Sequence, residues 1–95
     1  MLDKLEKLEK EYLELQNKLA DPDVIANQSE YKILSRKYKS LEKAANLAKR
    51  LRDAHNALNE AEEIIKMEDD SEMIDLAKEQ MAEAKKDIEK LDEEA

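Results

Sequence analysis

Apolar residues recur along the first part of the chain at the spacing of a helix. They are separated alternately by three and four positions, which brings them to one face of an α-helix in the heptad pattern of a coiled coil. The pattern predicts a helix over about residues 2–20. Asp21-Pro22 should end it, because proline lacks an amide hydrogen and disfavours helical geometry in the preceding residue. The same pair is also suited to begin a short extra turn. The seam comprises Leu5, Leu8, Tyr12, Leu15 and Leu19.

A second, long helix is predicted over about residues 28–67, where no proline interrupts the sequence. Asn27 is a good N-cap, and Glu30, three residues later, completes a capping-box-like pair. A helix of about 40 residues is about 60 Å long. Its apolar residues form two seams at different angles around the axis. The first comprises Tyr31, Leu34, Tyr38, Leu41, Ala45 and Ala48, and the second Leu47, Leu51, Ala54, Leu58, Ala61 and Ile65.

A third helix is predicted over about residues 71–94, opened by the capping residues Asp69-Asp70-Ser71. The fold class that follows is all-α and coiled-coil-like, with two shorter helices packed antiparallel along one long central helix. In that arrangement Tyr12 meets Tyr38 and Leu58 meets Met81. The seam of the third helix comprises Ile74, Ala77, Met81, Ala84, Ile88 and Leu91.

Composition supports helices and limits the chain to one domain. The 95 residues include no glycine and a single proline, whereas sheet proteins depend on turns that favour these residues. Charged residues make up 44% of the chain, but the helical periodicity of the apolar 41% indicates folding and not disorder. Without a long apolar run or a signal-peptide pattern, the sequence predicts a cytoplasmic protein with no membrane partner.

Sequence features of enzymes and metalloproteins are missing. The chain has no cysteine, no glycine for a phosphate-binding loop, and one histidine, His55, which lies beside the second seam. The acidic runs at residues 68–70 and 92–94 are better explained as a helix cap and a solvated tail than as a calcium site. We therefore expect no catalytic, cofactor-binding or metal-binding residues, no small-molecule ligand and no enzymatic activity in this chain.

Charge is distributed unevenly along the chain. The net charge is +2 over residues 1–50 and −10 over residues 51–95. Five cations of the long helix fall within one narrow stripe, nearly opposite the first seam, so the first helix should not neutralise them. Such a stripe fits a nucleic-acid backbone or an acidic protein, although a solvated outer face is the simpler interpretation. The candidate contact residues are Lys32, Arg36, Lys39, Lys43 and Arg50.

The first 42 residues resemble the N-terminus of bacterial peptide chain release factor 1, a class I release factor. The resemblance rests on the opening Leu/Glu/Lys heptads with Tyr12, followed by Asp21-Pro22-x-Val24-Ile25 and two tyrosine motifs. These motifs are Tyr31-x-x-Leu34 and Tyr38-x-x-Leu41-Glu42. The Asp-Pro turn favours this factor over the sister factor that reads UGA. Lys37 departs from the family, which more often has an acid before the tyrosine.

The resemblance implies the N-terminal helical domain of a factor that directs translation termination at UAA and UAG. In the family this domain reaches toward the stalk base of the large ribosomal subunit, where a ribosomal protein and 23S rRNA lie. The other implied partners are the remaining domains of the release factor. The Gly-Gly-Gln loop and the codon-reading tripeptide of the family lie downstream, so catalytic and codon-reading domains are expected to be absent from residues 1–95.

A second interpretation remains open. Heptads also serve purely structural antiparallel coiled coils that bind other proteins or associate with themselves. Salt dependence distinguishes the two interpretations, because binding to RNA through lysine and arginine weakens steeply as salt rises, whereas association through apolar residues does not.

Overall fold

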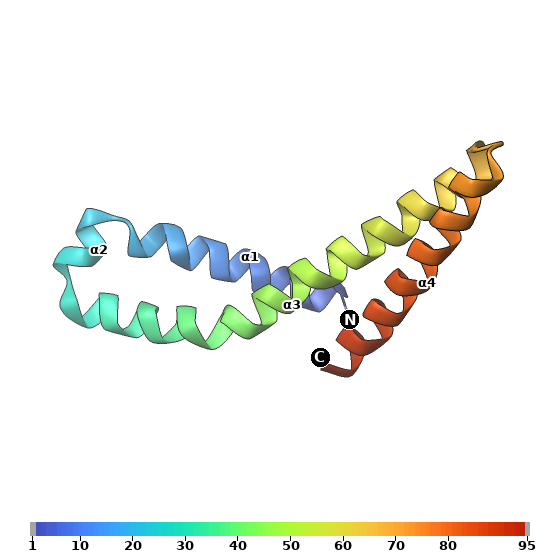
Figure 1. Cartoon of the computed structure of the whole chain (residues 1–95). Coiled ribbons are helices and arrows are strands. Elements are labelled where there is room, and N and C mark those ends of the chain that lie inside the picture. The colour runs from blue at the N-terminus through green and yellow to red at the C-terminus, as the bar shows by residue number, and fades with distance from the viewer. Residues whose placement is uncertain (1, 95) are drawn as a thin grey trace. The chain divides into compact units, whose positions relative to one another are not determined.

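The computed structural model describes residues 2–94, and these are almost entirely helical (Figure 1). Four helices follow one another: α1 (Leu2–Leu19), α2 (Pro22–Ala26), α3 (Gln28–Met67) and α4 (Ser71–Glu94). No strand occurs among the described residues. The predicted all-α class and the long central helix are thus confirmed. The count differs by one, because the Asp-Pro segment opens the short helix α2.

The chain divides into two compact units. The first unit ends at Lys49 and the second begins at Arg50, so α3 contributes its N-terminal part to one and its C-terminal part to the other. Each unit is a pair of long helices, with α2 added in the first. Two helices bury only the side that each turns to the other, which explains why both cores are thin.

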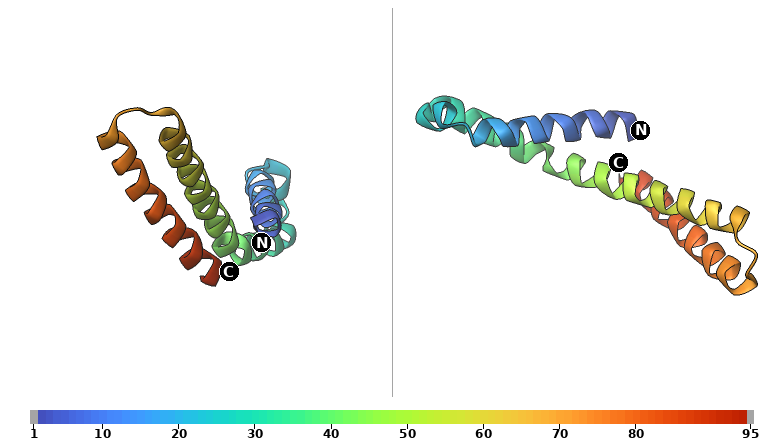
Figure 2. Two further views of the ribbon diagram at one scale, coloured as in Figure 1. Left: turned by 90° about the vertical axis from the view of Figure 1, so that its right-hand side faces the viewer. Right: turned by 90° about the horizontal axis from the view of Figure 1, so that it is seen from above.

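In the first unit, α1 runs back along the N-terminal part of α3 (Figures 1 and 2). The predicted pairing of Tyr12 with Tyr38 is confirmed, since the rings stack with centroids 4.3 Å apart. Tyr31, predicted in the same seam, is instead 41% exposed in the first turn of α3. Val24 of α2 is buried although the heptads did not include it. The core residues here are Leu5, Leu15, Val24, Ala45, Leu47 and Ala48.

Side-chain caps close the turns of the first unit, and no described residue has a positive φ angle. Asp21 caps α2 by accepting a hydrogen bond from the N–H of Asp23 at 2.9 Å. Asn27 caps α3, its Oδ1 accepting from the N–H of Glu30 at 3.2 Å. The second half of the expected capping box does not form, because the N–H of Asn27 donates to the carbonyl of Val24. A glycine-free chain thus makes its turns with Asp and Asn.

In the second unit, α4 runs antiparallel along the C-terminal part of α3 (Figures 1 and 2). Asp70 caps α4, accepting from the N–H of Glu72 at 2.9 Å, and the Glu68 carboxylate accepts from two N–H groups of the turn. Some of the larger seam residues, including Leu58 and Met81, are only partly buried. The seam alanines Ala54 and Ala61 on α3 and Ala77 and Ala84 on α4 are all buried, so the two helices pack closely. The core residues are Leu51, Ala54, Ala61, Ala77, Ala84 and Leu91.

Candidate functional site

Four of the five predicted contact residues lie exposed on the part of α3 that belongs to the first unit. Their spacing of four, three and four residues keeps them within one stripe along the helix. Among the described residues none of the four has an ion-pair partner within 4.0 Å. The stripe is therefore a set of solvated cations that form no direct ion pair within the described part of their unit. Its members are Lys32, Arg36, Lys39 and Lys43.

Arg50, the fifth predicted contact residue, differs from the other four in its surroundings. It is the first residue of the second unit, and its Nη1 lies 3.3 Å from Oε2 of Glu94 on α4. Helical spacing correctly puts Arg50 in line with the stripe, but spacing along one helix reveals nothing of an acid 44 residues away. The Arg50 side chain is still 57% exposed, so its role as a contact residue stays a prediction, but because it has an acid beside it we define the basic stripe by the other four.

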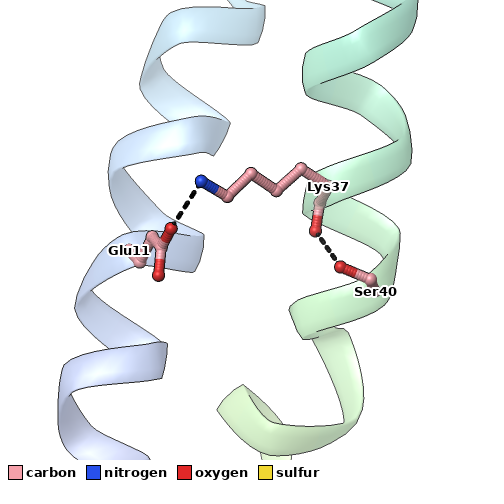
Figure 3. A network of polar contacts seen from close by, with 3 residues as sticks. All are labelled: Glu11, Lys37 and Ser40. Atoms are coloured by element: carbon pink, nitrogen blue, oxygen red, sulfur yellow. Dashed lines mark hydrogen bonds and ion pairs between the residues drawn. The ribbon is translucent and has the colours of Figure 1, made fainter.

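Lys37 is a cation of the same segment that turns away from the stripe. Its Nζ lies 2.8 Å from Oε1 of Glu11 on α1, while Ser40 Oγ donates to the Lys37 carbonyl at 2.7 Å (Figure 3). Both ionic side chains are about half exposed, so the pair contributes only about 0–1 kcal/mol to stability. Its main consequence is electrostatic, because the acid that α1 offers at this level of α3 goes to Lys37.

The tyrosine pair determines which side of α3 faces α1. The Tyr12 and Tyr38 rings are nearly parallel, at 11°, and both are partly exposed. A hydrogen bond with the Tyr38 side chain, together with burial and the nearby charges of Tyr38 and Glu42, raises the pKa of Tyr12 to about 12. Because Tyr38 faces α1, the stripe lies on the far side of α3, as the sequence predicted.

The Lys37–Glu11 pair is the contact that sequence reasoning missed. In the sequence, Lys37 stood out only as a departure from the family pattern. The predicted pairing of Tyr12 with Tyr38 was the signal that could have identified it. Glu11 and Lys37 are the residues directly before those tyrosines, and neighbours of a paired position across two antiparallel helices lie within reach of each other.

Residues 2–94 contain no group of three or more His, Asp or Glu side chains arranged to hold a metal ion. His55 lies on α3 in the second unit and is partly buried. Ser40 donates its hydroxyl to a backbone carbonyl. Over the same residues, every helix is too short or too polar to cross a bilayer.

Comparison with known proteins gives one family and several relatives. The profile of the PCRF domain matches residues 8–95. Peptide chain release factor 1 of Clostridium botulinum strain Hall is 35% identical over 94 residues, and that of strain 657 is 34% identical over the same length. The alignment covers 99% of this chain but 26% of each relative, so the chain spans about a quarter of their length. No solved structure matches the chain.

Proposed function

The chain belongs to the PCRF domain family, and from this premise we propose that it is a ribosome-docking domain of a peptide chain release factor. The relatives are peptide chain release factor 1 proteins, which supports a role in translation termination. The finer part of the proposal is termination at UAA and UAG. It is supported by Asp21-Pro22, the feature by which the sequence resembles factor 1, here an N-cap and the first residue of α2.

The observation that carries the docking proposal is the basic stripe. Four exposed cations on one side of α3 point away from α1 and lack ion-pair partners among the described residues. Cations arranged in this way bind phosphate groups and release counterions from the nucleic acid. We propose that they contact 23S rRNA or an acidic protein surface at the stalk base of the large subunit, in the cytoplasm. The remaining domains of the factor would correspond to the part of the relatives that this chain does not cover.

In this proposal the chain itself is not catalytic. A hydrolytic site needs groups that position and activate water, and these act as a nucleophile, a base and an orienting residue held together. The present chain has one histidine, and no glycine from which a Gly-Gly-Gln loop could be built. Its contribution is instead binding and orientation, made by a helical surface that carries positive charge.

Charge reversal in the full-length factor tests the proposal. Replacement of all four stripe residues by glutamate should weaken ribosome association and flatten its salt dependence. The residues changed are Lys32, Arg36, Lys39 and Lys43. Each lost phosphate contact changes the slope of log affinity against log salt by about 0.7–0.9. The free energy of unfolding should change little, since each exposed helix charge contributes only about 0.3 kcal/mol. Association is measured by sedimentation with ribosomes at several salt concentrations.

The matched control reverses four exposed lysines of α4, namely Lys78, Lys85, Lys86 and Lys90. The change in net charge is the same, but the position is different. An equal effect of the two sets would mean that only net charge matters and that the stripe is an ordinary solvated face. Self-association that persists at high salt would instead support a structural coiled-coil module.

A further inference from the structure

Large apolar side chains are exposed near the turn that joins α3 and α4. Met67, at the end of α3, is 84% exposed, and Met73 and Leu76 on α4 are 45% and 51% exposed. Leu76 and Met73 precede Gln80 by four and seven residues, so these three residues share one side of α4. Isolated apolar residues on a surface are ordinary, whereas apolar residues that gather in one patch are typical of interaction sites.

Two hollows of 370 and 300 Å³ lie along that same side of the second unit, between α3 and α4. They share Ala54, Ala57 and Asp87, and so form one continuous depression, which we name the α3–α4 groove. Gln80 lines it at the end near the turn, and Leu91 lines it at the other. The exposed Met73 and Leu76 therefore extend the groove toward the turn.

The floor of the groove is apolar and is formed mainly by small side chains. Ala54 and Ala84 are buried, Ile64 is partly buried, and Ala57 is exposed. Alanine has no side chain beyond Cβ, so a docked helix can approach the backbones of α3 and α4 closely. A third helix laid here would use the side of each helix that the two-helix packing leaves open, and would cover Ile64, Leu76 and Met73 as well.

The rim of the groove is predominantly acidic. Four carboxylates line the two hollows, and the only cations that line them are Arg50 and Lys90 at one end. Arg50 already has a partner in Glu94. The excess negative charge matches the net charge of −10 over residues 51–95. A ligand that fits this rim must be basic at its flanks. The rim acids are Asp53, Glu60, Glu83 and Asp87.

We propose that the α3–α4 groove docks an amphipathic helix of a partner protein, with an apolar stripe of leucine-like residues flanked by lysine and arginine. Helices bind grooves of this kind through apolar anchors spaced three and four residues apart. A second copy of this chain does not supply such a helix. The amphipathic helix α1 has five acids and four lysines, and the apolar seam of basic α3 faces α1. The proposal concerns the second unit and does not depend on the basic stripe or on ribosome binding.

The test uses a synthetic peptide of about 18 residues, made only of leucine and lysine, with leucines three and four apart. Its binding to the full 95-residue chain is measured by fluorescence anisotropy, and the contact surface is mapped by amide chemical-shift changes. A peptide of the same composition in scrambled order is the control for attraction by charge alone. The ordered peptide should bind more tightly, with the largest shifts around Ala57, Ile64 and Gln80.

Ala57→Glu separates docking from simple attraction. The longer side chain obstructs the groove, so docking predicts binding weakened by about tenfold, whereas general charge attraction predicts tighter binding to a more acidic protein. Ala82→Glu is the matched control, because Ala82 is exposed on α4 and lines neither hollow. Glutamate is a good helix former at both exposed positions, so both variants should fold. Leu76→Gln, a milder change, should also weaken binding. Unchanged or tighter binding by Ala57→Glu, or equal binding of the ordered and scrambled peptides, would overturn the proposal.

Discussion

Tyr12 and Tyr38 illustrate how much of the first unit depends on single contacts. The stacked rings join α1 to α3, and among the described residues of this unit only six side chains are buried in the core. Aromatic stacking adds about 0.5–1.5 kcal/mol beyond the burial of area. The pair also fixes the rotation of α3 about its axis, and through it the direction of the basic stripe.

The raised pKa of Tyr12 predicts an alkaline limit to the stability of the first unit. In the folded chain the pKa is about 12, above the ordinary 10.0 of tyrosine, so the folded state holds the proton more tightly than the unfolded state. The stabilisation is complete below pH 10 and is lost as the pH rises toward 12. Circular dichroism melts from pH 8 to pH 12 (about one-unit steps) should show the loss. The Tyr12→Phe variant should have a lower melting temperature than the parent chain at neutral pH. Its melting temperature should, however, fall less between pH 10 and pH 12. An identical alkaline decline in both proteins would contradict this.

In the second unit, truncation of Leu51 should lower the free energy of unfolding most. It is 1% exposed, whereas Leu58, the middle of the predicted seam, is only partly buried. Leu51→Ala should lower the free energy of unfolding by about 2–4 kcal/mol, the range for large-to-small changes in a core. Leu58→Ala should cost less, and Leu13→Ala, at a half-exposed position, least. Urea denaturation of the three variants gives the order, and a larger loss for Leu58→Ala would mean that the seam centre is better packed than its exposure indicates.

At the scale of the helices, helix boundaries were the most predictable feature, because caps and heptads are local. Asn27 and Asp70 cap α3 and α4 near the positions that the sequence indicated. The contacts that sequence reasoning did not find depend on how distant residues pack. Arg50 meets an acid on another helix, and Asn27 gives its N–H to a carbonyl of α2 instead of Glu30. Neither partner can be found from periodicity, because it is set by how two elements pack.

The caps give the prediction that belongs to this scale. Asn27→Ala and Asp70→Ala each remove a side-chain acceptor for a backbone N–H at the start of a helix. Each should reduce the free energy of unfolding by about 1 kcal/mol. Asp70→Asn keeps an acceptor at the cap and should cost much less. Guanidinium denaturation measures all three, and equal losses for Asp70→Ala and Asp70→Asn would show that charge at the helix N-terminus, not the hydrogen bond, is what stabilises α4.

At the scale of the whole chain, the two units differ in what they offer to a partner. The first presents the basic stripe, and the second presents an acidic rim around an apolar groove. The overall charge asymmetry was visible in the sequence, because it needs only counting. The groove was not, because its residues come from two helices and include apolar positions outside the heptad seams, such as Ala57 and Ile64. The division near Lys49 was equally hidden, since nothing interrupts the helical pattern there.

The isolated chain should therefore bind but not catalyse. On ribosomes stopped at UAA with peptidyl-tRNA in place, residues 1–95 alone should release no peptide above the buffer control, because the proposed function gives this chain a binding role and leaves hydrolysis to other parts of the factor. A full-length factor is the positive control in the same assay. Added in excess, the chain should slow release by the full-length factor if it occupies the same docking surface, and the four-residue reversal of the stripe should abolish that inhibition. Codon-dependent release by the chain alone would contradict the binding role. Inhibition that persists after the stripe is reversed would show that the docking surface lies elsewhere on the chain.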